Sequence, residues 1–274
     1  MQSSGAFLLH FHPIHGMLEP EEKWKTGEGA PMKRIGMLLA LLAVLLLPCG
    51  TAEKETSGSC GVNTSWRLED GVLTISGTGE MHNYIDQAPW SDSRDEITAL
   101  VLEPGVTNLG DEAMKACENL QWVSIGPDVT KLGKRAFCGC TSLQEITIPD
   151  TVTEIGGGGF MDCTALSCVT LPEGLTTIAY FCFQECSSLT EIALPEHLQT
   201  IEDAAFEGAG LTEVILPDTI TQVGENAFMG TPVVHARLSA GCEEWSGTFT
   251  DCTELQSVEI PECSCDQAFV LSGR

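Results

Sequence analysis

The chain has 274 residues, of which 43% are hydrophobic and 19% charged, and its formal net charge at pH 7 is −26. A surface this negative repels the phosphates of nucleic acids and anionic lipid headgroups, which argues against both as partners. The apolar fraction is high enough for a packed core, so the acidity does not indicate a disordered chain.

Residues 32–52 carry a pattern typical of a secretory signal peptide. They begin with a basic pair, continue with an apolar run from Met37 to Leu47, and end with small residues. The run is shorter than the ~20 residues that span a bilayer. We therefore expect cleavage before Glu53, a mature chain that is secreted or held at the cell surface, and no membrane insertion after signal removal.

The segment before the signal pattern needs a separate interpretation. Residues 1–31 lack signal-like features, so we interpret them as an upstream extension that results from a start codon placed too early. Met32 is then the expected first residue. The alternative in which Cys49 is lipid-modified stays open, although Pro48 stands where a small residue is expected.

Residues 53–95 are predicted to form a β-rich cap. The segments Trp66–Leu68 and Val72–Ser76 flank Glu69–Gly71, which is a hairpin signal. Trp66 and Trp90 are expected to pack inside this cap.

Residues 96–262 repeat one pattern with a period of about 21–23 residues. An aromatic or Met position recurs at spacings of 23, 23, 23, 23, 22 and 21 residues, at Met114, Phe137, Phe160, Phe183, Phe206, Phe228 and Phe249. Three residues after each of these stands a small residue, namely Cys117, Cys140, Cys163, Cys186, Ala209, Thr231 and Cys252. Self-similarity at a fixed period is the signature of a repeat architecture.

Each unit predicts one short strand followed by a turn. In one copy Ile146 and Ile148 alternate with polar residues, which indicates a strand with one buried face. Pro149 then ends the strand, because proline cannot continue a ladder. The segments IEDAAF and VGENAF, which lead into the aromatic position, are expected to form one turn of α- or 3₁₀-helix.

A single unit cannot fold alone, because ordering its backbone costs more than its few apolar side chains return on burial. The units must therefore stack into a solenoid with a parallel sheet along one side, and the cap covers the open N-terminal end. Residues 263–274 lose the pattern and are expected to form an irregular tail.

The unit L-x-x-I-x-I-P-x-x-V-x-x-I, read from Leu143 to Ile155, resembles the BspA-like leucine-rich repeats of bacterial surface and secreted proteins. Cys60–Tyr84 resembles the segment that often precedes such repeats. The resemblance implies a leucine-rich-repeat-like right-handed coil, with one parallel β-sheet face and short helical or 3₁₀ turns opposite. It also implies a binding protein, since BspA-like proteins include adhesins that bind host matrix proteins.

The sequence contains no recognisable catalytic, cofactor or metal site. The cysteine column is expected to point its thiols in parallel rather than at one point, so we interpret Cys as a small apolar filler. Gly156–Gly159 lacks the Lys-Ser/Thr of a phosphate loop and is interpreted as a loosened turn. We therefore expect no enzymatic activity, no cofactor and no metal.

The outward-facing side chains of the strands form the candidate ligand-binding face. Because side chains alternate across a strand, the register predicts two outward columns. From these columns we select Trp122, Ser124, Glu145, Thr147, Thr170, Glu191, Glu213, His235 and Arg237. Trp122 and Arg237 stand out, since aromatic residues and arginine are enriched among binding hot spots. The competing interpretation is that the cap covers Trp122.

The sequence favours an exported, non-catalytic and monomeric binding module that recognises an extracellular protein or glycan through this face. The alternative is a structural protein of the cell envelope that assembles by stacking through its solenoid ends. A hydrolase with an unrecognised site is disfavoured, because none of the motifs that would carry such chemistry is present.

Overall fold

The computed structural model describes residues 55–261, except for residues 86, 243–244 and 246. The chain divides into two units, and the described residues all belong to the second, Lys54–Arg274. The predicted upstream extension (1–31), signal peptide (32–52) and tail (263–274) all lie outside the described residues. Within the described ranges, no helix is both long enough and apolar enough to cross a membrane.

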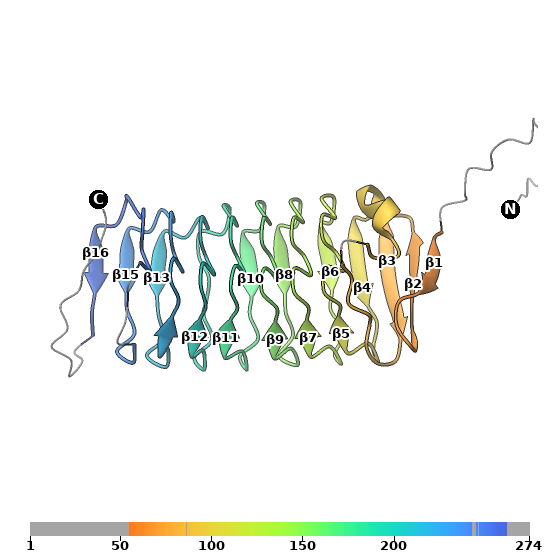
Figure 1. The fold of residues 1–274 in the computed structure, drawn as a ribbon, viewed down its shortest axis with the longest axis horizontal. Coiled ribbons are helices and arrows are strands. Elements are labelled where there is room, and N and C mark those ends of the chain that lie inside the picture. Colours follow the sequence, from red (N-terminus) through yellow and green to blue (C-terminus); the bar gives the residue numbers. More distant parts are fainter. Residues whose placement is uncertain (1–54, 86, 243–244, 246, 262–274) are drawn as a thin grey trace, which may run out of the picture. The chain divides into compact units, whose positions relative to one another are not determined.

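The second unit is a β-solenoid of about eight turns with little helix, as the repeats predicted (Figure 1). Among the described residues the one helix is η1, a 3₁₀-helix at Ser91–Glu96. The strands are β1 (Ser57–Ser59), β2 (Thr64–Glu69), β3 (Val72–Gly77), β4 (Ala99–Leu102), β5 (Asn108–Leu109), β6 (Trp122–Ser124), β7 (Lys131–Leu132), β8 (Glu145–Thr147), β9 (Glu154–Ile155), β10 (Cys168–Thr170), β11 (Thr177–Ile178), β12 (Thr200–Ile201), β13 (Glu213–Ile215), β14 (Gln222–Val223), β15 (His235–Arg237) and β16 (Ser257–Glu259).

The N-terminal end is a mixed sheet in the order β1-β2-β3-β4-β6. Strands β2 and β3 form the predicted hairpin, and Asp70 and Gly71 turn the chain with φ values of 48° and 80°. Strand β3 then pairs in parallel with β4, so the hairpin continues directly into the repeats. Trp66 and Trp90 are buried beneath it with an edge-to-face contact of 5.7 Å between ring centroids, which confirms their packing role.

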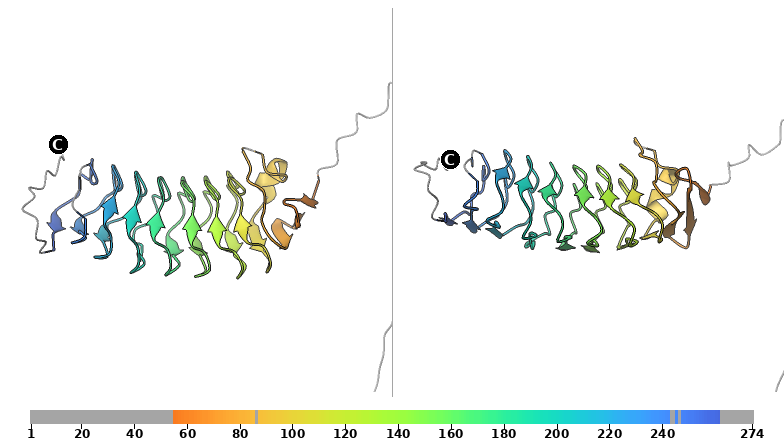
Figure 2. Two further views of the ribbon diagram at one scale, coloured as in Figure 1. Left: turned by 60° about the horizontal axis from the view of Figure 1, so that its bottom comes forward. Right: turned by 90° about the horizontal axis from the view of Figure 1, so that it is seen from below.

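Each coil contributes strands to two rows. The first, which we call the main sheet, consists of β4, β6, β8, β10, β13, β15 and β16, and carries the candidate face. The second consists of the two-residue strands β5, β7, β9, β11, β12 and β14. The views in Figure 2 show successive coils side by side along the solenoid. All pairings within the two rows are parallel, because every coil runs in the same direction.

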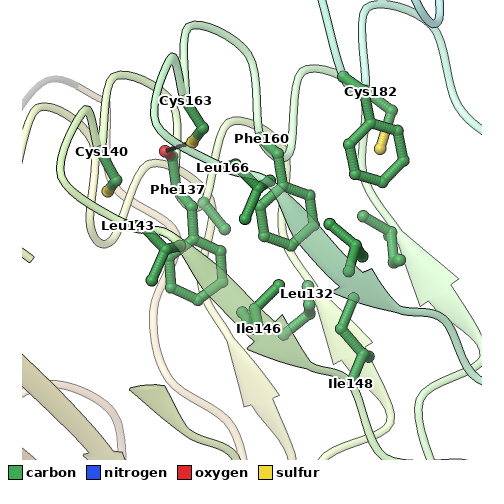
Figure 3. Close-up of a cluster of buried hydrophobic side chains, with 14 of the residues drawn as sticks. Leu132, Phe137, Cys140, Leu143, Ile146, Ile148, Phe160, Cys163, Leu166 and Cys182 are labelled. Carbon is green, nitrogen blue, oxygen red and sulfur yellow. Dashed lines mark hydrogen bonds between the residues drawn. The ribbon is translucent and has the colours of Figure 1, made fainter. Parts of the chain in front are cut away.

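The core contains a continuous aromatic stack. Phe137, Phe160, Phe183, Phe206, Phe228 and Phe249 lie in one column, with ring centroids 5.2–5.5 Å apart and interplanar angles of 12° or less. Figure 3 shows Phe137 and Phe160 in this column, with Leu143 and Ile146 beside them. The repeat period therefore predicted the core correctly.

The predicted helical turns are instead non-helical turns that join neighbouring coils, which corrects the sequence-based expectation. The N–H groups of Arg135, Phe137 and Gly139 donate to carbonyls of the next coil at 2.8–3.0 Å. The N–H groups of the residues between them close turns within their own coil. A helix cannot form because two residues in each turn have left-handed backbone, for example Arg135 at φ 52° and Gly139 at φ 74°.

Among the described residues the main sheet is interrupted twice. Strands β6 and β8 are not paired, and no strand forms at Glu191–Leu194, where the pattern predicted one. In the described part of the chain, no ladder hydrogen bond joins this segment to either neighbouring coil, and Ile192 and Leu194 are only half-buried. The next coil is shorter by one residue. The equivalent positions Cys168, Glu191 and Glu213 are first 23 and then 22 residues apart, because Gly210 alone replaces the pair Ser187–Ser188 before the strand. The Thr212 N–H donates to the Thr190 carbonyl, so the chain keeps the repeat register at the entry to β13.

Candidate functional site

All nine predicted residues lie along the outward side of the main sheet. Trp122, Glu145, Thr147, Thr170, Glu191, Glu213 and His235 are exposed, whereas Ser124 and Arg237 are half-buried. The register places Glu145 beside Cys168 and Glu213 beside His235, so the columns run straight across the strands. The strand row brings these residues onto one face of the solenoid.

Trp122 is exposed rather than covered by the cap. Its side chain is 53% exposed, although it lies next to the N-terminal mixed sheet. The register aligns Trp122 with Ala99 of β4 and Val72 of β3, and both of these are half-buried. Together with Val101 of β4 they form an apolar patch that we call the tryptophan platform. A large aromatic side chain gains nothing from such a position in the free protein.

The basic residues of the face are already engaged within the chain. Arg237 donates from Nη2 to Asp218 Oδ1 at 3.1 Å and from Nη1 to the Leu216 carbonyl at 3.1 Å. His235 Nδ1 lies 2.7 Å from Ser257 Oγ. Arg237 is therefore held as part of the C-terminal coils, and a ligand would have to compete with Asp218 for it.

The central face is negatively charged. Glu145, Glu191 and Glu213 are exposed, and in the part of the chain that the structure describes none of them forms an ion pair. Between Glu145 and Glu213 the two outward columns hold no basic side chain. Arg237, the nearest cation along the columns, is neutralised by Asp218.

Two exposed apolar features are not among the predicted site residues. Ile215, 58% exposed, lies on the face directly beside Arg237. Tyr180 and Phe181 form an edge-to-face pair on the turn side, 40% and 38% exposed, and Phe181 adopts a left-handed backbone with φ 55°. The sequence signal was available, since Tyr180 follows Gly157 one coil later and its ring lies where a Cβ on Gly157 would stand.

The cysteine column is part of the framework. Cys140 Sγ donates to the Met114 carbonyl at 3.2 Å. Cys163 Sγ donates to the Phe137 carbonyl at 3.1 Å (Figure 3). Each thiol therefore links its coil to the preceding one, a role beyond the predicted apolar filling. Burial raises the pKa of the Cys117 thiol to about 12, and it raises the pKa values of Cys140 and Cys163 well above the ordinary range.

Neither a disulfide nor a metal-binding cluster is present in the described ranges. The ten cysteines in the described ranges are free thiols. Across the same residues no group of three or more His, Cys, Asp or Glu side chains is arranged to hold a metal ion. The exposed face is therefore the feature of the described chain with the strongest case for a function.

The comparisons with known proteins agree with this architecture. A profile of the BspA type leucine rich repeat region matches in six copies, over residues 107–235 and 176–267. No curated protein matches the chain.

Several solved structures are similar. A leucine rich cell surface protein from Faecalibacterium prausnitzii has 23% sequence identity and a TM-score of 0.54, and the match covers 75% of this chain and 70% of that one. A leucine-rich repeat protein of T. pallidum has 25% identity and a TM-score of 0.49, covering 72% and 80%. One from Bacteroides ovatus has 20% identity and a TM-score of 0.46, covering 72% and 70%.

At 23% identity, the likeness to the F. prausnitzii protein concerns the fold alone. The family profile reaches further, because it matches the repeated sequence itself over more than half of the chain. The chain belongs to the BspA-type leucine-rich repeat family.

Proposed function

We propose that this chain is a non-catalytic binding module, secreted or held at the cell surface, that recognises an extracellular protein or glycan through the outer face of the main sheet. One observation carries the proposal: Trp122 is 53% exposed on a strand of the main sheet. Exposed aromatic side chains on a rigid scaffold are enriched among binding hot spots. The similarity to a protein described as a cell surface protein supports the location.

A pull-down from extracellular proteins and glycans tests this function. The immobilised chain should retain a partner, and Trp122→Ala should weaken retention without changing the melting temperature. Thr151→Ala, which removes an exposed side chain from outside the two outward columns, is the matched control. Equal retention by the original chain and the Trp122→Ala variant would remove the face from consideration.

Export has its own test. Mass spectrometry of the secreted protein should find a mature N-terminus near Glu53, as the signal pattern of residues 32–52 predicts. An intact Met1, or a lipid on Cys49, would contradict this assignment.

Assembly through the solenoid ends is the second candidate function. In the described range, β1 and β16 each pair with one strand only, so each leaves one edge of the sheet open. Open strand edges are templates for pairing with another chain. Light scattering coupled to size exclusion separates the two functions, because a monomer across the concentration range contradicts stacking.

A further inference from the structure

We propose that the outer face of the main sheet binds an extended cationic polypeptide segment, which lies across the strands with one end on the tryptophan platform. The inference rests on the proposed function and names its partner class. It follows from three features of the face: its charge, its spacing and its interrupted ladder.

The charge of the face selects a cationic partner. Glu145, Glu191 and Glu213 point outward in one column, and within the described residues no ion pair neutralises them. They occupy equivalent outward positions in their coils, on the same side of the solenoid as Trp122. Complementary potentials steer association and suppress partners of the wrong charge. An anionic partner, such as a sulfated glycan, would meet repulsion here.

The spacing of the face fits an extended chain. Parallel strands lie ~4.8 Å apart, so the four coils from Trp122 to Glu213 span roughly 19 Å. An extended polypeptide rises ~3.3 Å per residue, so about six residues cover that distance. Side chains that alternate along the ligand then reach the face about every 6.6 Å, within reach of flexible glutamates on neighbouring coils.

The interrupted ladder offers main-chain partners at the centre of the face. Glu191–Leu194 makes no ladder hydrogen bonds to neighbouring coils in the described part of the chain, so its backbone N–H and C=O groups are not committed to the ladder. Glu191 and Ala193 are exposed. Peptide ligands commonly obtain affinity from main-chain hydrogen bonds and specificity from side-chain contacts. A glycan has no repeating backbone amide that matches this arrangement.

The tryptophan platform anchors one end of the ligand. A Lys ammonium or Arg guanidinium binds over the face of a Trp ring within ~6 Å of its centroid. The neighbouring Val72, Ala99 and Val101 side chains are half-buried and accept the aliphatic part of a Lys or Arg side chain. At the other end of the face, beyond the glutamates, the Arg237 guanidinium is paired with Asp218. This pair limits the length of the cationic segment that the face can bind.

The test measures binding of the full chain to synthetic peptides of about ten residues, a length that covers the face. The probes are an alternating Lys-Thr peptide and an alternating Glu-Thr peptide, with a neutral oligosaccharide as a third ligand. Of the three ligands, only the Lys-Thr peptide should give a binding signal in calorimetry. Its affinity should fall as the salt concentration is raised. Stronger binding of the Glu-Thr peptide or of the oligosaccharide would overturn the inference.

The overall negative charge makes a matched control necessary. Glu145→Gln/Glu191→Gln/Glu213→Gln removes three charges from the face, whereas Glu118→Gln/Glu173→Gln/Glu196→Gln removes three exposed charges from outside the two outward columns. We expect the face variant to lose about tenfold in affinity for the Lys-Thr peptide, which corresponds to about 0.5 kcal/mol for each exposed charge pair. The control variant should lose less than about twofold. Equal losses would show that only the net charge matters and would overturn the inference.

The ring itself is tested by Trp122→Ala and Trp122→Phe. We expect Trp122→Ala to weaken binding of the Lys-Thr peptide and Trp122→Phe to restore part of it, since Phe also accepts a cation over its ring. Equal affinity of all three proteins would contradict the anchor. If the peptide fails to bind while the pull-down partner still depends on Trp122, the cationic inference is wrong and the proposed function stands.

Discussion

The turn side and the main sheet of this solenoid are built from the same repeat, yet they differ in continuity. On the turn side the stacked Phe column is continuous, and the coil-to-coil hydrogen bonds continue from Glu112 to Gly230. The main sheet, by contrast, is interrupted between β6 and β8 and again at Glu191–Leu194. The second strand row is interrupted elsewhere, between β9 and β11. The turn side therefore holds the coils together, and the strand pairing of the main sheet is free to vary along the solenoid.

The largest expected effect comes from removing a ring from the stack. Phe160 is fully buried between Phe137 and Phe183, so Phe160→Ala should lower the free energy of unfolding by about 3–5 kcal/mol. Chemical denaturation measures this loss. Phe249→Ala should cost less, because Phe249 has one stacked neighbour and is only half-buried. Similar costs for Phe160→Ala and for an exposed sheet residue would contradict the comparison.

A methyl group on the turn side should have a smaller but clear effect. A Cβ on Gly156 would stand 2.6 Å from the backbone nitrogen of Lys134, and that backbone cannot move without breaking the coil contact. Gly156→Ala should therefore cost about 1–3 kcal/mol of unfolding free energy. Gly174→Ala is the matched control, because no heavy atom lies within 4 Å of its added Cβ. Thermal melting compares the two, and identical melting temperatures would be the contrary result.

The buried thiols predict a pH dependence of the turn side. Burial raises the pKa of Cys117 from its ordinary value of 9.0 to about 12, so between these pH values the unfolded chain loses a proton that the folded chain keeps. Stability is therefore full below pH 9 and falls as the pH rises toward 12. Each such thiol contributes a slope of about 1.4 kcal/mol per pH unit. Denaturation series should show a shallower decline for Cys117→Ala, and an unchanged slope would contradict the burial.

Thiol labelling should separate the two regions in a single sample. Cys168 is exposed on the main sheet, whereas Cys140 and Cys163 are fully buried on the turn side. A thiol reagent followed by peptide mapping should modify Cys168 in the folded chain and reach the other two only on unfolding. Rapid modification of Cys140 in the native protein would disagree with this arrangement.

The smallest expected effect is on the main sheet. Thr147 is exposed on β8 and forms no side-chain hydrogen bond within the described chain, so Thr147→Ala should change stability by about 0.5 kcal/mol or less. Chemical denaturation under the conditions used for Phe160→Ala gives the direct comparison. A cost above about 2 kcal/mol would show that the face is part of the framework.

The sequence predicted the features that depend on the repeat period or on local sequence. The Phe column, the buried cysteines and the hairpin around Asp70–Gly71 follow from periodicity and turn chemistry. It could not predict the interruption at Glu191–Leu194, because Ile192 and Leu194 keep the strand pattern of the other coils. The sequence could not predict the left-handed turns either, since residues as different as Arg135 and Phe181 occupy the equivalent left-handed position in their turns.

The candidate face was predictable in its position but not in its chemistry. The period-two alternation placed Trp122 and Glu145 outward. The pairing of Arg237 with Asp218 joins residues of two neighbouring coils, and it depends on side-chain geometry that the repeat pattern does not specify. The exposure of Trp122 likewise depended on where the cap ends, which the pattern left open.

Native-state hydrogen exchange tests the central claim most directly, because it reports on both regions of the same molecule. In the free chain, the amides of Phe137 and Phe160 should exchange only on global unfolding, and those of Ile192 and Ala193 should exchange as solvent-exposed groups. With the Lys-Thr peptide bound, exchange should slow at Ile192 and Ala193 and stay unchanged at the Phe column. Equal protection of Ile192 and Phe160 in the free chain, or slowing confined to the turn side on binding, would contradict the account.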